Sequence, residues 1–82
     1  MSTKIELPKY AWLYDHPANK KGDLSATFYE DGGHGSITVS IQRGEAGQFY
    51  HSTERGGVSE GRFSRGELQK VLEISQILLN HL

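Results

Sequence analysis

A helix begins within Phe63-Ser64-Arg65-Gly66-Glu67-Leu68, the most informative six residues of the chain. Ser64 and Glu67 have the spacing of a capping box, in which each side chain accepts a hydrogen bond from the other residue's backbone N–H. The apolar residues at the two ends of this stretch occupy the positions of a hydrophobic staple. Because these signals agree, the sequence predicts a C-terminal helix from Arg65 to His81.

The predicted helix is amphipathic. At about 100° per residue, one arc of its surface collects apolar side chains, with Ser75 as the sole polar member. Ile74 lies at the edge of this arc, and Ile77 lies on the opposite side. The apolar surface is wider than one thin sheet requires. A solvent-exposed isoleucine is the simpler explanation, and a homodimer through Ile74 and Ile77 is the alternative. The arc expected to dock on the sheet consists of Leu68, Val71, Leu72, Leu78, Leu79 and Leu82.

Upstream of the helix, short runs of alternating apolar and polar residues are separated by glycine clusters. Nine of the ten glycines lie between Gly32 and Gly66. Glycine permits the positive φ angles of tight turns, so this spacing is typical of a β-meander. The alternation is clearest at 36–43, where every second residue is Ile or Val. The expected strands are Tyr10–Tyr14, Leu24–Glu30, Ser36–Arg43, Gln48–Glu54 and, interrupted by Gly61, Val58–Phe63.

The predicted fold class is α+β, with an antiparallel β-meander of four to five strands packed by one C-terminal amphipathic helix. A chain of 82 residues forms at most one domain and has a thin core. We expect residues 1–8 to be flexible or extended, residues 9–63 to form the sheet and residues 64–82 to form the capped helix. Because the chain has no cysteine, disulfides and thiolate metal sites cannot compensate for the small core.

Charge and hydropathy exclude several classes of protein. The formal net charge is −1 and the pI is about 6.4, which differs from the strongly basic balance of duplex-binding domains. No stretch approaches the roughly 20 apolar residues of a membrane span. Residues 1–8 lack the apolar core of a secretory signal. We therefore expect a cytoplasmic protein, in its own cell or in a host cell.

The sequence gives little support to catalysis. The histidines lie far apart, without a zinc-binding spacing, and we expect no metal and no cofactor. The run 51–54 supplies His, Ser, Thr and Glu, but strand neighbours point to opposite faces, so His51 and Ser52 cannot pair locally. The chain is therefore predicted not to be an enzyme. A small histidine-dependent ribonuclease, with His34 and His51 flanking a phosphate, remains as the second alternative.

A lone helix covers one face of the sheet, and the other face is free to bind. Tyr, Trp and Arg are the residue types enriched at interface hot spots. Arginines interleaved with aromatic rings also bind single-stranded nucleic acid through phosphate contacts and base stacking. The candidate residues of this aromatic and basic surface are Tyr10, Trp12, Tyr14, Tyr29, Arg43, Tyr50, Arg55 and Arg62.

The favoured hypothesis is a small non-enzymatic binding protein that works through the exposed sheet face. Its size, balanced charge and lack of catalytic motifs are typical of phage- or plasmid-encoded inhibitors and adaptors, which block a partner protein or ligand. The expected partner is a host or regulatory protein, with no membrane involved. The first alternative is a dimer that binds single-stranded nucleic acid.

Overall fold

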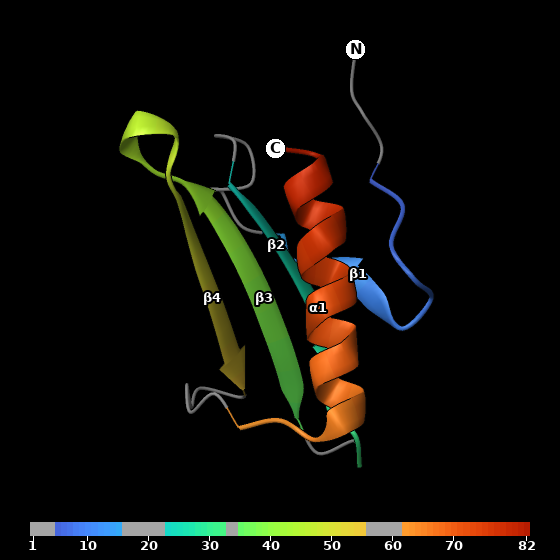
Figure 1. Ribbon diagram of the computed structural model, residues 1–82. Coiled ribbons are helices and arrows are strands. Elements are labelled where there is room, and N and C mark those ends of the chain that lie inside the picture. Colours follow the sequence, from blue (N-terminus) through green and yellow to red (C-terminus); the bar gives the residue numbers. More distant parts are fainter. Residues whose placement is uncertain (1–4, 16–22, 33–34, 56–61) are drawn as a thin grey trace.

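The computed structural model describes residues 5–15, 23–32, 35–55 and 62–82. They form a four-stranded antiparallel sheet in the order β1-β2-β3-β4 with one helix along one of its faces, which is the predicted α+β fold (Figure 1). The elements are β1 (Ala11–Leu13), β2 (Leu24–Tyr29), β3 (Ser36–Arg43), the 3₁₀ turn η2 (Glu45–Gly47), β4 (Phe49–Arg55) and α1 (Arg65–Asn80).

The sheet follows the predicted meander, and each strand pairs with the next in sequence. In the β2–β3 pair, Leu24 lies opposite Ile41; in the β3–β4 pair, Arg43 lies opposite Phe49. The turn between β3 and β4 needs a left-handed backbone at Gly47, where φ is 76°. Most of the predicted fifth strand, 58–63, lies outside the described residues, and the two residues at its end, 62 and 63, belong to no strand.

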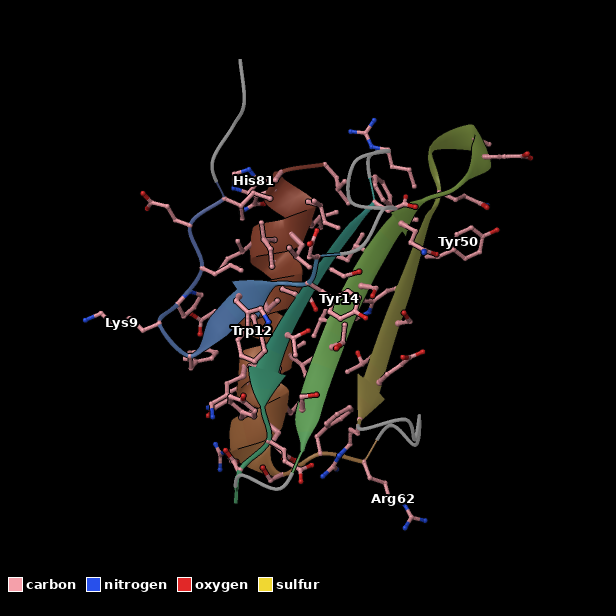
Figure 2. All side chains as sticks on the ribbon, turned by 180° about the vertical axis from the view of Figure 1, so that it is seen from behind. Lys9, Trp12, Tyr14, Tyr50, Arg62 and His81 are labelled. Carbon is pink, nitrogen blue, oxygen red and sulfur yellow. The ribbon has the colours of Figure 1, made fainter. Side chains whose placement is uncertain are left out.

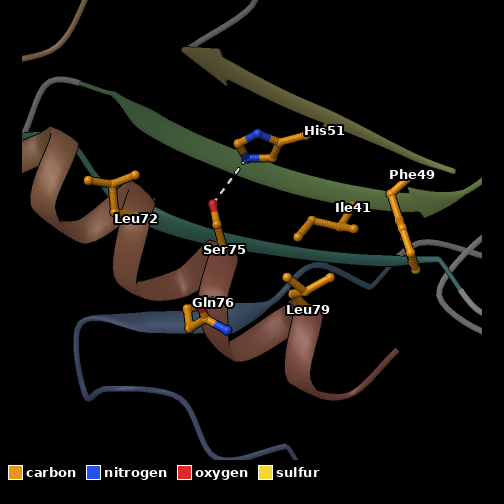
Figure 3. A pocket seen from close by; sticks show the side chains of 7 residues that line it. All are labelled: Ile41, Phe49, His51, Leu72, Ser75, Gln76 and Leu79. Carbon is orange, nitrogen blue, oxygen red and sulfur yellow. Dashed lines mark hydrogen bonds between the residues drawn. The ribbon is translucent and has the colours of Figure 1, made fainter.

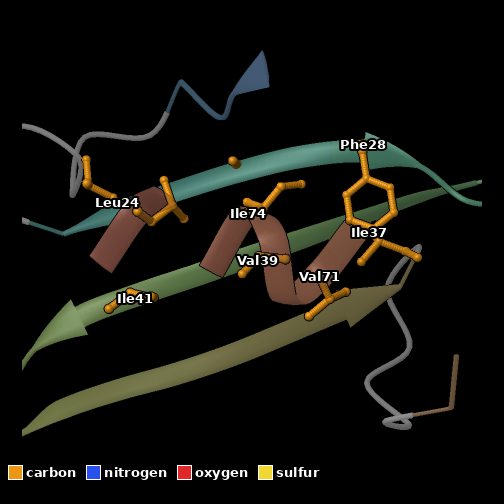
Figure 4. Close-up of a cluster of buried hydrophobic side chains, with 9 residues drawn as sticks. Leu24, Phe28, Ile37, Val39, Ile41, Val71 and Ile74 are labelled. Atoms are coloured by element: carbon orange, nitrogen blue, oxygen red, sulfur yellow. The ribbon is translucent and has the colours of Figure 1, made fainter. Parts of the chain in front are cut away.

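The core lies between α1 and the sheet. Alternation along β2 and β3 points one apolar set toward the helix, as the sequence predicts (Figure 4). Ile74 is fully buried in this core, so the proposed use of Ile74 in a dimer interface is corrected. Ile77 is half-buried on another side of the helix. The buried apolar residues are Leu24, Ala26, Phe28, Ile37, Val39, Ile41, Val71, Ile74 and Leu78.

The helix is rotated relative to the arc predicted from its sequence. Its buried stripe is Glu67, Val71, Ile74 and Leu78. Three leucines expected in the core form a second stripe, displaced by one residue along the chain, and they are 44% to 60% exposed. One residue corresponds to about 100° of rotation. The predicted arc contained residues of both stripes, so its centre lay between them. The exposed stripe consists of Leu68, Leu72 and Leu79.

A cluster of polar contacts at the start of α1 fixes this rotation. The capping box is confirmed: Ser64 Oγ accepts from the Glu67 N–H, and Glu67 accepts from the Ser64 N–H. The other carboxylate oxygen of Glu67 accepts from the Asp31 N–H at 3.1 Å and lies 3.7 Å from the Arg55 guanidinium. Arg55 also pairs with Glu30 at 3.2 Å. These contacts hold Glu67 toward the sheet. The next residue, Leu68, therefore points away from the core.

These contacts lower two carboxyl pKa values. The backbone N–H of Ser64 is the main cause of the lowered pKa of Glu67, with further contributions from the Asp31 N–H and the Arg55 charge, against the opposing effect of burial. The pKa of Asp31 is lowered by hydrogen bonds from the Ser64 hydroxyl and the Lys70 ammonium. The start of the helix is thereby tied to the β2–β3 turn and to the end of β4.

Candidate binding surfaces

The face of the sheet opposite α1 carries a pair of exposed aromatic rings. Trp12 lies opposite Thr27 in the β1–β2 pair, and its neighbours on either side in β1 lie opposite core residues. Strand alternation therefore points Trp12 away from the helix. Its ring packs on Tyr29, with 5.3 Å between the centroids and 54° between the planes. Trp12 is 43% exposed and Tyr29 is 64% exposed, so the pair offers a contiguous aromatic surface.

Two further tyrosines extend this open face. Tyr14 and Tyr50 are exposed, and Figure 2 shows Tyr14 over the sheet beside Trp12, with Tyr50 at the far margin on β4. The strip between them is polar. Its hydroxyls pair across β2 and β3, Ser25 with Ser40 and Thr27 with Thr38, each at 2.9 Å. We define the open-face aromatic surface as Trp12, Tyr14, Tyr29 and Tyr50.

Tyr10 does not belong to the open face, which corrects its assignment. Its ring meets Phe28 edge to face at 6.1 Å, and its hydroxyl donates to the Glu73 carboxylate on α1 at 2.8 Å. Lys70 lies over the same ring. Burial, with the Glu73 contact, raises the pKa of Tyr10 to about 12. The predicted strand begins one residue before β1, and strict alternation along it places Tyr10 beside Trp12.

The arginines are not on the open face either, and this corrects the basic half of the predicted surface. Arg43 and Arg55 share the register of the core-facing residues of β3 and β4. Arg43 donates to the Leu82 carbonyl, and Arg55 binds the carboxylates described above. Arg62 is exposed beyond the end of the sheet (Figure 2). Glu54 is the one charged residue among the described strand residues whose register faces away from α1.

A second surface, which the sequence analysis missed, lies between β4 and α1 (Figure 3). It is a groove of about 410 Å³. The exposed leucine stripe supplies one wall through Leu72 and Leu79, and Phe49, which is 46% exposed, lies opposite. The sequence does indicate an apolar surface here, because the residues of α1 form two parallel apolar stripes and the core needs only one of them. The lining residues are Ile41, Phe49, His51, Leu72, Ser75, Gln76 and Leu79.

A histidine and a serine meet inside this groove. His51 Nε2 lies 3.0 Å from Ser75 Oγ, and Ser75 Oγ donates its hydrogen to the Val71 carbonyl at 2.6 Å. Because a hydroxyl has one hydrogen, His51 must donate from Nε2. This polarity is the reverse of a nucleophilic serine activated by a base. The pair therefore acts as an internal polar contact, while His34, the other member of the ribonuclease hypothesis, lies outside the described residues.

Two further findings bear on the class of protein. Within the parts of the chain that the structure describes, no three His, Asp or Glu side chains gather where they could hold a metal ion. In the same residues, no helix has the length and apolar content to cross a bilayer.

The fold and its surfaces define a small α+β protein with a half-covered antiparallel sheet. Comparisons with protein-family models, curated protein sequences and solved structures give no match. Function must therefore be inferred from the surfaces themselves.

Proposed function

We propose that this chain is a non-enzymatic binding protein that engages a partner protein through the open-face aromatic surface. The observation that carries the proposal is the exposed Trp12–Tyr29 pair on the side of the sheet away from α1. Large aromatic side chains bury much area at low cost in side-chain entropy, which is why they dominate interface hot spots. The pair adds nothing to the core, so burial against a partner would give it an energetic role.

The polar strip beside the pair supports a protein partner. Its serine and threonine hydroxyls are paired with each other, so each keeps one hydrogen-bond partner when a partner protein covers this strip. The surrounding face is nearly uncharged. An aromatic anchor beside a satisfied polar area resembles the centre and rim of a standard protein interface.

Single-stranded nucleic acid fits this face less well. Phosphate contacts supply most of the affinity of such binding, and they come from Lys and Arg. Arg43 and Arg55 face the helix side and are engaged within the chain, and Glu54 adds negative charge to the open face. The assignment to phage- or plasmid-type inhibitors, the cytoplasmic location and the homodimer stay predictions.

The test compares proteins captured by the wild type with those captured by two variants. Trp12→Ala removes the open-face anchor, and Phe49→Ala removes a similarly exposed ring on the other side of the sheet. Circular dichroism would first establish that both variants fold. A partner retained by Phe49→Ala and lost by Trp12→Ala supports the proposal, and its affinity for Trp12→Ala should fall at least about 30-fold, as for a hot spot.

Equal capture by all three proteins would overturn the proposal. A labelled single-stranded oligonucleotide, titrated at low and high salt, separates the alternative. Binding that weakens as salt rises and that needs Trp12 would favour nucleic acid over a protein partner.

A further inference from the structure

We infer that the partner protein bound by the open-face aromatic surface carries a Lys or Arg side chain that pairs with Glu54, at the opposite edge of the sheet from Trp12. The inference rests on the proposed function and adds to it the chemistry of the partner. Glu54 belongs to β4, the strand farthest from β1 in the order of the sheet. The partner would therefore meet Trp12 near its centre and Glu54 near its margin.

The register of the sheet places Glu54 level with Trp12. One row of residues crosses all four strands on the face away from α1, because each member lies directly opposite the next. The row consists of Trp12, Thr27, Thr38 and Glu54. Three gaps of about 4.8 Å separate the four strands, so the two ends of the row lie roughly 14 Å apart. One end is an aromatic ring, the middle is two hydroxyls bonded to each other, and the other end is a carboxylate.

The size of a typical interface brings both ends of this row under one partner. A standard interface buries about 800 Å² on each side, which corresponds to a disc of roughly 16 Å radius. A disc centred on the Trp12–Tyr29 pair reaches Glu54 near its rim. The open-face aromatic surface also includes Tyr50, which lies on the same strand and the same face as Glu54. A partner that spans from Trp12 to Tyr50 therefore approaches Glu54 as well.

The charge of Glu54 is not compensated on this face. The other described strand residues that face away from α1 are aromatic or neutral. Glu54 is exposed, and within the described residues it makes no ion pair. The adjacent Arg55 has the register of the helix side and binds two other carboxylates there. A partner that covers the Glu54 carboxylate must replace its water, and a cation does so at the least cost.

A charge on an edge strand has a second use, which is to discourage pairing with other strands. Any charge serves that purpose, so Glu54→Lys preserves it. Recognition of a cation depends on the sign of the charge. Glu54→Lys therefore abolishes recognition and places two like charges opposite each other. One variant thus separates the two roles.

Position within the interface determines which rate each side chain controls. A charge at the rim acts mainly on the rate of association and on its salt dependence. An aromatic ring at the centre contributes most of the contact area, and its loss acts mainly on the rate of dissociation. We expect the Glu54 variants to slow association and Trp12→Ala to speed dissociation.

The test uses a phage-displayed library of random peptides of about 16 residues, long enough even as a helix to span the row. Peptides that bind the immobilised wild type and not Trp12→Ala should be enriched in Lys or Arg relative to the unselected library. At low salt their affinity should fall about twofold to fivefold for Glu54→Gln, as for the loss of a rim ion pair, and at least about fivefold for Glu54→Lys. Both effects should shrink as salt rises.

Glu6→Lys is the matched control. Glu6 is exposed, and its neighbours Ile5 and Leu7 pack against the core on the helix side of the sheet. Its replacement changes the net charge by the same amount as Glu54→Lys, and it should leave the affinity within about twofold. Circular dichroism would establish that every variant folds.

Three outcomes would overturn the inference. The first is a set of Trp12-dependent peptides that bind Glu54→Gln and Glu54→Lys as tightly as the wild type, in which case the proposed function stands without the cation. The second is a single-stranded oligonucleotide that binds the wild type and binds Glu54→Lys more tightly, because a polyanion is repelled by the carboxylate. The third is a wild-type dimer in sedimentation that Trp12→Ala converts to a monomer, because the described strand residues on this face of a second copy offer no cation.

The proposed function fails in a different way. If all enriched peptides bind Trp12→Ala as tightly as the wild type, the open-face aromatic surface is not the binding surface, and the inference falls with it. Dependence on Trp12 without dependence on Glu54 removes the inference alone.

Discussion

The most informative perturbation of this fold is Glu67→Gln. Glutamine keeps the shape of the side chain but has one acceptor oxygen, whereas Glu67 uses one oxygen for the Ser64 N–H and the other for the Asp31 N–H. The amide NH₂ of the variant would face one of these donors. The attraction to the Arg55 guanidinium, 3.7 Å away, would also be lost.

The expected cost can be worked from these contacts. Losing a hydrogen bond to a charged group costs about 1.5 to 3 kcal/mol, and a buried N–H left unpaired costs about 1 to 3 kcal/mol. These terms overlap, so we expect the free energy of unfolding to fall by about 3 kcal/mol. A domain of this size has a total of about 4 to 12 kcal/mol. The thermal midpoint should then fall by about 12 to 24 °C.

Urea unfolding followed by far-ultraviolet circular dichroism measures this change. The control is Glu54→Gln, an exposed glutamate on β4, which should change the free energy of unfolding by less than about 0.5 kcal/mol. Equal midpoints for the two variants at pH 7 would refute the role assigned to Glu67.

The pH dependence gives a second test of the same reasoning. The pKa of Glu67 is lowered by folding, so its stabilising effect is present above the unfolded value near 4.5 and is lost as pH falls through the lower folded value. The gap between wild type and Glu67→Gln should therefore close as the solution is acidified below about pH 4. A gap that stays constant down to pH 3 would show that shape, not charge, accounts for the effect.

Three further changes probe the rest of the fold in the same unfolding assay. Ile74→Ala should cost about 2 to 5 kcal/mol because the residue is fully buried, whereas Leu72→Ala should cost under about 0.5 kcal/mol; similar costs would mean that the helix is rotated differently. Gly47→Ala should cost about 1 kcal/mol from backbone strain alone, since φ is 76° and no atom lies within 4 Å of the new methyl group; a neutral result would contradict that turn geometry. Ser64→Ala should cost about 1 kcal/mol through loss of the N-cap, and an unchanged midpoint would rule the cap out as a stabilising contact.

The elements of the fold were predictable because each carries its own local signal. Alternation along Ser36–Arg43 predicts β3 to the residue, and the capping box predicts the first residue of α1. The order of β2, β3 and β4 followed from the glycine-rich turns between them, which join neighbours in sequence. These signals depend on short-range geometry, which a single sequence records directly.

The composition of the candidate surfaces was only partly predictable. Trp12 and Tyr29 lie on the open face, in agreement with strand alternation. Arg55 could not be assigned from sequence, because its position depends on carboxylates contributed by the end of β2 and the start of α1. Its partner Glu30 follows β2 directly, and pairing between distant segments leaves no periodic pattern to recognise.

The rotation of α1 connects the stability of the fold to its surfaces. A buried carboxylate is a costly core residue, and a leucine in its place would avoid that cost but would leave the Ser64 N–H and the Asp31 N–H without their acceptor and Arg55 without one of its carboxylates. Glu67 instead makes one rotation of the helix distinct from its neighbour, because only that rotation brings its oxygens to the Asp31 N–H and Arg55. With this rotation, Leu72 is left 60% exposed, although its burial would be worth about 1.5 to 3 kcal/mol. The contacts of one buried carboxylate therefore determine that Leu68, Leu72 and Leu79 lie on the outer surface of α1 and not in its core.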